Sequence, residues 1–480
     1  MPQGTLDEQA IRRRVARAGQ SHVLRFWDSL SPAGRRRLLG QLAAVDFREM
    51  AALVRRHVTH PKPFRLPPGL KPARFIALPR TALERRRRLQ RRRLGEELLA
   101  AGKVAAFVVA GGQGSRLGLD GPKGALPVGP VSGRPLFEVF ADGILAARKA
   151  YRAAIPWYIM TSDANDQATR RFFEDHDFFG LPSDDVRFFV QGMMPAVDRA
   201  GKLILATRDS LAWNPDGHGG SIRALARSGM LADMAARGIE HISYFQVDNP
   251  LVPPVDPVFI GCHAAARSDM SSKMARKREA KEKIGAFCVS KGRLCVVEYS
   301  DLPDRLAEAR DSKGRLRFEA GSIAIHILAR KFVERLTAGD RFALPFHRAE
   351  KKIACVDAAG RAATPDKPNG VKFETFVFDA LPLARRTVVL EIDRRREFSP
   401  VKNADALDTP TTARHDMLML HAGWLEEAGV TVPRRPDGEP RFWVEINPRA
   451  ARNVEELRAL VARRGIRKVT RDLYLGPDEA

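Results

Sequence analysis

The sequence predicts an α/β protein whose core is a doubly wound sheet, with a helical module before it and a small domain after it. Two continuous apolar runs, Val104–Ala110 and Ile155–Met160, have the character of strands that are covered on both faces. Helical segments alternate with such runs, which predicts right-handed crossovers. The length of 480 residues suits two or three domains. We therefore expect a basic helical module over 1–100, the core over 101–400 and a C-terminal domain over 401–480.

The first hundred residues predict helices. Apolar side chains recur at helical spacing over 22–50. Ser31-Pro32 interrupts them, as an N-cap followed by a first-turn proline would. Pro61–Pro72 is rich in proline and should form an extended connector. A charged helix is expected after it, up to about Leu99.

The elements of the core can be placed in order. A glycine-rich loop follows the first strand, and the second strand enters its helix through Ser162-Asp163. The other expected elements are a helix at Leu136–Lys149, strands at Arg187–Val190 and Ile242–Val247, and a hairpin within Ala286–Tyr299 that turns at Lys291-Gly292. After Pro400 the pattern becomes helical and then mixed.

The charge of the chain is strongly positive and uneven. The net charge is +24, and residues 1–100 hold 23 Lys or Arg against 8 Asp or Glu, a balance of +15. Much of this excess lies in the runs Arg85–Arg88 and Arg91–Arg93, which suit the solvated face of a helix. A nucleic-acid partner is the alternative, although these runs lack interleaved aromatic residues and match no known binding motif.

Several classes of protein are disfavoured. No stretch reaches the roughly 18–20 uncharged apolar residues that span a bilayer, and residues 1–14 lack the apolar region of a secretory signal. The four cysteines, Cys262, Cys288, Cys295 and Cys355, form no CxxC pair. This argues against a zinc site or a disulfide framework and favours a cytoplasmic location.

The loop over Gly111–Gly118, followed by Pro122-Lys123-Gly124, is the strongest local signal. Glycines let backbone amides approach phosphate closely, Arg116 can grip phosphate oxygens with its planar fork, and Lys123 can add a charge. The loop lacks the Gly-Lys-Ser/Thr ending of a P-loop, and its last glycine falls one place too late for the dinucleotide motif. A purely structural tight turn remains the alternative.

The run Ala110–Gly124 resembles the signature of eukaryotic-type UDP-sugar pyrophosphorylases, in particular those that make UDP-N-acetylglucosamine. Further blocks resemble the same family in the same order. They are Leu24–Trp27, Pro156–Ser162, Gln191–Pro195, Pro215–Gly220, Val247–Asn249, Val297–Ser300, Pro365–Gly370, Phe376–Asp379 and Phe398–Asp405.

The resemblance implies a Rossmann-like nucleotide-diphospho-sugar transferase core. It also implies a reaction of UTP with N-acetylglucosamine 1-phosphate, assisted by Mg²⁺, that releases pyrophosphate. Glucose or galactose 1-phosphate is the alternative sugar, and a nucleic-acid-binding protein is a distant alternative. Such a reaction depends on positioning and on neutralising phosphate charge.

The resemblance also assigns roles to residues of the nucleotide site. Arg116, Lys123 and Lys402 would hold the reacting phosphates, with surface ion pairs as the alternative for the first two. Backbone groups near phosphate or base would come from Ala110, Gly111, Gly112, Gly114 and Gly217. Gln191 would pair with uracil, since an amide both donates and accepts hydrogen bonds; without the resemblance it would be a surface residue at the end of a strand.

Metal and sugar ligands follow from strand ends and from the same resemblance. Asp248 ends an apolar strand, where α/β proteins bind ligands, and its hard oxygens suit Mg²⁺; a capping or turn aspartate is the alternative. By resemblance Glu298 would accept hydrogen bonds from sugar hydroxyls, and Gly285 would add a backbone contact. Phe376 and Phe378 would wall the sugar pocket, or else belong to the core.

Two residues depart from the acetylglucosamine pattern. His218 stands where the family usually has Asn, and Ser322 replaces the Asn of a Gly-Asn-Ile segment. Both positions would contact the sugar, so they affect the identity of the sugar and not the transfer of the uridylyl group. His218 could also be a neutral core histidine, but its flanking glycines favour contact with a ligand.

Overall fold

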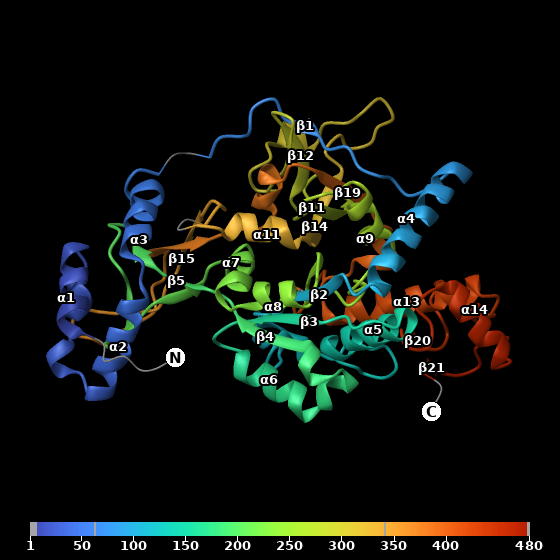
Figure 1. The fold of residues 1–480 in the computed structure, drawn as a ribbon, viewed down its shortest axis with the longest axis horizontal. Helices are drawn as coiled ribbons and strands as arrows, with labels where there is room; N and C mark the ends of the chain where they lie inside the picture. The colour runs from blue at the N-terminus through green and yellow to red at the C-terminus, as the bar shows by residue number, and fades with distance from the viewer. Residues whose placement is uncertain (1–6, 62–63, 340–341, 478–480) are drawn as a thin grey trace. The chain divides into compact units, whose positions relative to one another are not determined.

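The computed structural model describes residues 7–61, 64–339 and 342–477 (Figure 1). These residues form two compact units, each built from three separate segments. The N-terminal unit takes Met1–Arg65, Gln191–Arg223 and Ala343–Asp379, and the core unit takes the remaining segments Leu66–Val190, Ala224–Phe342 and Ala380–Ala480. The predicted division at residues 100 and 400 stays a prediction.

The core unit is organised around a mixed ten-stranded sheet, which confirms the predicted α/β class. Its main path runs β1-β12-β14-β10-β2-β3-β4, and the neighbours β10, β2, β3 and β4 are parallel. The strands are β1 (Lys71–Pro72), β2 (Val104–Val109), β3 (Trp157–Thr161), β4 (Val186–Val190), β10 (His241–Gln246), β11 (Met270–Arg276), β12 (Ala286–Ser290), β13 (Arg293–Val297), β14 (Ala320–Ala329) and β19 (Thr387–Glu391). Every residue of β2 is buried, as its apolar run predicts.

The hairpin of β12 and β13 confirms the predicted turn. Lys291 and Gly292 have φ of 48° and 75°. Two successive positive φ values are typical of the tight turn whose twist matches that of the strands, and glycine adopts them at no steric cost. Residue 62 and residue 63 of the predicted proline-rich connector lie outside the described residues, and its end forms β1.

Helices alternate with strands along the core unit, as the sequence pattern predicts. They are α4 (Ala82–Ala100), α5 (Leu136–Tyr151), α6 (Asp166–Asp175), α8 (Met230–Ala236), α9 (Pro257–Ala265), α10 (Asp304–Ala307), α11 (Arg330–Thr337) and α12 (Arg394–Glu397). Short 3₁₀ turns are η4 (Ser115–Leu117), η5 (Lys123–Ala125), η6 (Asp177–Gly180) and η7 (Ser183–Asp185). The predicted charged helix is α4, which begins with a capping box of Thr81 and Glu84.

The helices α4 and α9 cross very closely. A Cβ added to Gly95 would lie 1.8 Å from the Pro257 carbonyl oxygen, and one added to Gly261 would lie 1.7 Å from the Arg91 carbonyl oxygen. The two glycines therefore permit backbone contact that any side chain would prevent.

The end of the chain forms its own cluster of apolar side chains within the core unit. Its elements are α13 (Pro410–Glu427), α14 (Val454–Arg463) and the parallel pair β20 (Val444–Ile446) and β21 (Leu473–Leu475). Among the described residues, no helix is both long and apolar enough to cross a bilayer.

The N-terminal unit packs helices against small antiparallel sheets. Its helices are α1 (Glu8–Arg17), α2 (Pro32–Ala44) and α3 (Phe47–Val54), with η1 (Ser21–Leu24), η2 (Trp27–Ser29) and the π-helix η3 (Arg55–Thr59). Its strands are β5 (Met193–Pro195), β6 (Val197–Asp198), β7 (Leu205–Thr207), β8 (Ser210–Leu211), β9 (Trp213–Pro215), β15 (His347–Lys351), β16 (Cys355–Val356), β17 (Ala362–Ala363) and β18 (Gly370–Glu374). Ser31 caps α2 and Pro32 is its first residue, as predicted.

Two further elements begin in one unit and end in the other. They are α7 (Gly220–Arg227) and the 3₁₀ segment η8 (Val377–Leu383).

Candidate functional site

The glycine-rich loop after β2 is closed by its own backbone. The Gly114 amide donates to the Gly121 carbonyl (2.9 Å), and the Lys123 amide donates to the Gly112 carbonyl (3.1 Å). Several amides of the loop make no hydrogen bond within the residues that the structure describes. They belong to Gly111, Gly112, Gln113, Ser115 and Arg116. Successive unpaired amides in a turn form a concave site for an anion such as phosphate.

Asn165 holds this loop in place, and sequence reasoning missed it. Its side-chain amide donates to the carbonyls of Ala110 (2.9 Å) and Gly112 (3.2 Å), and its oxygen accepts the Ser162 amide (2.8 Å). The residue is only 1% exposed. Its position just before α6 is the available signal, because Asn commonly caps helices. The predicted entry at Ser162-Asp163 is a turn, and α6 starts three residues later.

The predicted cations lie on the loop and on one neighbouring segment. Arg116 is exposed and forms no ion pair among the described residues. Lys123 donates from Nζ to the Val401 carbonyl (3.1 Å), and Lys402 follows that carbonyl directly in the chain. The structure therefore brings Lys123 and the Lys402 segment together.

Asp248 belongs to the same group. Because β10 and β2 are parallel, with Gln246 opposite Val109, the chain leaves both strands at one edge of the sheet. The Asp248 carbonyl accepts the Val401 amide (2.7 Å), which anchors the Lys402 segment beside it. The Asp248 carboxylate makes no hydrogen bond within the described part of the chain, and so it can bind a ligand.

The residues at this edge suit Mg²⁺, because this ion needs few ligands from the protein. No group of three or more His, Cys, Asp and Glu side chains is arranged for a metal ion among the described residues. Mg²⁺ commonly takes one or two carboxylates and completes its shell with substrate phosphates and water. Asp248 offers one such carboxylate at the sheet edge where the glycine-rich loop begins.

Three predicted sugar ligands meet elsewhere in the core unit. The Ser322 amide donates to the Gly285 carbonyl (2.8 Å), and a Cβ on Gly285 would lie 3.0 Å from Glu298 Oε1. Ser322 lies beside an irregularity of β14, where the register against β11 shifts and Ala324 has a positive φ of 56°. Irregular strands often aim side chains at a site.

The remaining predicted residues belong to the N-terminal unit. Gln191 is buried, so its interpretation as a surface residue is wrong. Its amide nitrogen donates to the Gly217 carbonyl (2.8 Å). Gly217 has φ of 82°, and a Cβ there would lie 2.3 Å from the Thr375 carbonyl oxygen, so this position needs glycine.

His218 stacks on Phe376 and makes a tilted contact with Phe378, the two predicted phenylalanines. Its ring centroid lies 5.3 Å from that of Phe376 and 5.8 Å from that of Phe378. Both phenylalanines are half-buried and alternate along the segment with the buried Thr375 and Val377. Their rings therefore line a surface and do not belong to the core.

The protonation state of His218 follows from its contacts. The Val377 amide donates to Nδ1 (3.3 Å), so Nε2 is assigned the proton. Burial, together with the charge of His347, lowers the pKa of His218 to about 4. The ring is neutral near pH 7 and offers Nε2–H as a hydrogen-bond donor.

Comparison with known proteins places the chain in a family. Residues 69–435 match the family described as UTP–glucose-1-phosphate uridylyltransferase. A UDP-N-acetylhexosamine pyrophosphorylase-like protein 1 of Xenopus tropicalis is 40% identical over 435 residues, covering 88% of this chain and 85% of the relative. The UDP-N-acetylglucosamine pyrophosphorylase of Saccharomyces cerevisiae is 36% identical over 432 residues, covering 86% and 90%.

A solved structure extends the likeness to the fold. The uridine diphosphate N-acetylglucosamine pyrophosphorylase of Trypanosoma brucei, crystallised with an inhibitor, is 26% identical, with a TM-score of 0.80 and coverage of 100% of both chains. The predicted nucleotidyltransferase type of fold is thereby confirmed. The chain therefore belongs to the UTP–glucose-1-phosphate uridylyltransferase family, the UDP-sugar pyrophosphorylases that its sequence resembles.

Proposed function

We propose that this protein transfers the uridylyl group of UTP to N-acetylglucosamine 1-phosphate and releases pyrophosphate. The observation that carries the choice of sugar is the match with relatives named for acetylhexosamine or acetylglucosamine, at 36–40% identity over at least 86% of this chain. The loop, the cations and the carboxylate at one sheet edge supply the charge complement that UTP needs.

The chemistry is an in-line substitution at phosphorus. An oxygen of the sugar phosphate forms a bond to the α-phosphorus of UTP, and the bond from that phosphorus to the bridging oxygen of pyrophosphate breaks. The free amides around Gly112 bind phosphate oxygens, while Arg116 and Lys123 offset their charge. A magnesium ion held by Asp248 would neutralise further charge on the phosphates.

Lys402 is the group that we assign to the reacting phosphates. The Val401 amide and carbonyl are both bonded, to Asp248 and to Lys123, so the backbone in front of Lys402 is fixed. The Lys402 side chain itself is exposed and free to reach substrate. Preorganised charge of this kind is effective because it needs no rearrangement during the reaction.

Glucose 1-phosphate is a second candidate substrate, and His218 and Ser322 favour it. Both stand at positions where the acetylglucosamine pattern has Asn. Neutral His218 can donate from Nε2 but its Nδ1 is already occupied by the Val377 amide. It therefore offers less to an acetamido group than an Asn would, since the side-chain amide of Asn both donates and accepts.

A panel of sugar 1-phosphates tests the proposal. The protein is assayed with UTP, Mg²⁺ and the 1-phosphates of N-acetylglucosamine, glucose and galactose, and pyrophosphate release is measured. We expect the highest kcat/KM with N-acetylglucosamine 1-phosphate, and a further shift towards it in His218→Asn and Ser322→Asn. A higher kcat/KM with glucose 1-phosphate would establish the second candidate instead. Silence with every sugar would overturn both.

A further inference from the structure

A cavity lies in the core unit, among residues to which no role in uridylyl transfer is assigned. Its volume is about 570 Å³, which lies within the roughly 300–1,000 Å³ of small-molecule sites. Its walls come from α4, α5, α13 and the stretches 250–258 and 445–453. We call it the α4–α13 cavity. Among the described residues, none of those that line this cavity is one that we predict to bind UTP, the sugar or Mg²⁺.

Much of the wall is apolar or aromatic. Leu89 on α4 is 47% exposed and lines the cavity. Tyr151 and Trp424 are half-buried there, beside the buried Val255 and Met417. The flat aromatic rings, together with the aliphatic side chains around them, suit a ligand with a flat apolar body.

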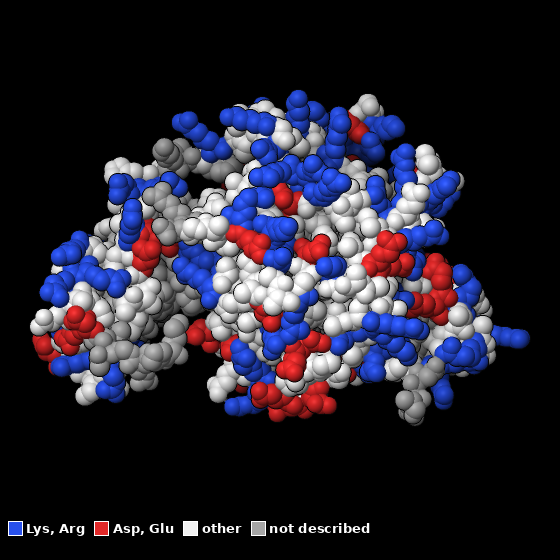
Figure 2. Space-filling view, viewed as in Figure 1, with Lys and Arg blue, Asp and Glu red and all other residues white. Residues whose placement is uncertain are grey.

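The rim formed by α4 is cationic. Arg85, Arg88 and Arg92 lie three and four residues apart, so they share one face of the helix. Arg92 is paired with Glu96, but Arg88 forms no hydrogen bond or ion pair among the described residues. Figure 2 shows Lys and Arg side chains gathered over α4. Arg88 is therefore available to an anionic group.

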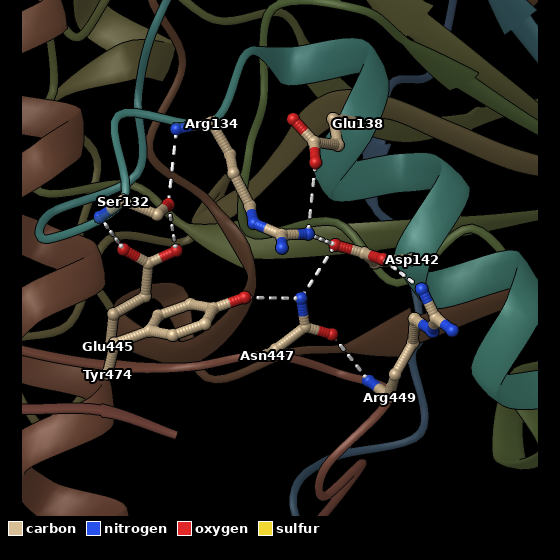
Figure 3. Close-up of polar contacts among 8 residues, drawn as sticks. All are labelled: Ser132, Arg134, Glu138, Asp142, Glu445, Asn447, Arg449 and Tyr474. Atoms are coloured by element: carbon tan, nitrogen blue, oxygen red, sulfur yellow. Dashed lines mark hydrogen bonds and ion pairs between the residues drawn. The ribbon is translucent and has the colours of Figure 1, made fainter. Parts of the chain in front are cut away.

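The acidic residues of the wall are held by the protein itself. Asn447 donates to the Asp142 carboxylate (2.7 Å), which Arg134 also binds, and the Ser132 amide donates to Glu445 (2.7 Å) (Figure 3). The Val131 amide also donates to Glu445 (2.8 Å).

Asp256 and Glu397, the other acids of the wall, both bind Lys273. Each acid of the wall thus has a partner on the protein itself. Arg88 also favours the charged form of Asp256 and of Glu397 from a distance, but neither Arg85 nor Arg88 forms an ion pair among the described residues, and so both can turn to an anion in the cavity.

Two polar atoms beside the cavity lack partners. His421 is 8% exposed, and its Nδ1 makes no hydrogen bond within the described residues; the same is true of Trp424 Nε1. Buried polar atoms normally have a partner. Both residues line the cavity, so the unpartnered atoms belong to its wall.

We propose that the α4–α13 cavity binds a small organic anion with a flat apolar body. The apolar body lies against Leu89, Tyr151 and Trp424, and the anionic group lies at Arg88 and Arg85. Charge-assisted bonds to arginine are roughly twice as strong as neutral ones, so Arg88 contributes most of the selectivity for an anion.

Titration with a fluorescent probe of this chemistry tests the proposal. The probe is anilinonaphthalene sulfonate, a flat apolar anion, added to the full chain. We expect saturable binding that Mg-UTP does not displace, and Arg88→Gln should weaken it at least fivefold. Arg87→Gln is the matched control, because Arg87 is an exposed neighbour outside the cavity, and it should leave binding unchanged.

A second pair of variants tests the apolar wall. Leu89→Asn should weaken probe binding at least threefold, whereas Leu83→Asn, on an exposed leucine of the same helix outside the cavity, should not. Anilinonaphthalene without the sulfonate should bind at least fivefold more weakly than the sulfonate. Equal effects of Arg88→Gln and Arg87→Gln, or displacement of the probe by Mg-UTP, would overturn the proposal. Unchanged thermal unfolding of each variant checks that it is folded.

Discussion

Lys273→Met should be the most damaging single change to the stability of the core unit. Lys273 is only 1% exposed, and its Nζ lies 2.6 Å from Asp256 Oδ2 and 2.5 Å from Glu397 Oε2. Burial alone would lower the pKa of Lys273, but the two carboxylates raise it above its ordinary value. The three groups therefore form a charged triad whose members depend on one another.

The magnitude follows from what the substitution leaves behind. Methionine fills most of the volume of lysine, so the cavity cost is small, but two largely buried carboxylates lose the cation that bonds to both of them. Leaving a buried charge without its partner costs about 3–5 kcal/mol. Uptake of a proton by Glu397, whose pKa burial already raises, would relieve part of this cost at low pH. We expect the loss of unfolding free energy, measured with urea, to be larger at neutral than at acidic pH.

The matched control is Lys281→Met. Lys281 also approaches two carboxylates, Asp304 and Glu308, but at 3.5 and 3.8 Å and with 64% of its side chain exposed. Exposed pairs are worth at most about 1 kcal/mol. If the two variants lose the same unfolding free energy, or if Lys273→Met loses more at acidic than at neutral pH, the reasoning from buried charge is wrong.

Three further changes have expected outcomes. Gly95→Ala should destabilise the core unit by about 3 kcal/mol in urea unfolding, because its Cβ would overlap the Pro257 carbonyl, whereas Gly423→Ala in α13, with nothing within 4 Å, should be neutral or stabilising. His263→Gln should flatten the pH dependence of stability, because burial lowers the pKa of His263 from 6.5 to about 3. Between these two pH values the unfolded chain binds more protons than the folded chain, so the folded state loses stability as the pH falls. From neutral pH to about pH 5, the unfolding free energy of the wild type should fall by about 2 kcal/mol more than that of the variant. Lys402→Ala should reduce kcat at least about tenfold, or about 1.4 kcal/mol of barrier, with unchanged unfolding; unchanged kinetics would remove Lys402 from the mechanism.

The parts of the fold that depend on local sequence were predictable. The apolar run of β2, the Lys291-Gly292 turn and the Ser31-Pro32 helix start each follow from a few adjacent residues, and all are confirmed. The glycine-rich loop was predictable for the same reason, since closely spaced glycines signal close approach of backbone and ligand.

Contacts between distant residues were not predictable from one sequence. Lys273 and Glu397 are 124 residues apart in the sequence, and Asn165 and Ala110, which are joined by a hydrogen bond, are 55 residues apart. A lysine, a glutamate or an asparagine in isolation carries no signal of such a partner. The same limit applies to the N-terminal unit, because no local pattern indicates that residues 1–65 fold with 191–223 and 343–379.

This composite unit also restricts how its first part can be studied. Residues 1–100 in isolation would lack the strands that cover their helices, so an unfolded, basic peptide could bind nucleic acid without any bearing on the native protein. A salt-dependent test of nucleic-acid binding should therefore use the full chain.

The discontinuous N-terminal unit has a consequence during synthesis. Val15, Leu38 and Leu42 leave the ribosome early, but they bury themselves against Val371 and Phe373, which emerge more than three hundred residues later. At about 5–20 residues per second, the wait lasts at least about 15 seconds. Throughout that interval the apolar side chains of the nascent helices remain exposed to water. We therefore expect this protein to depend on chaperones while it is synthesised.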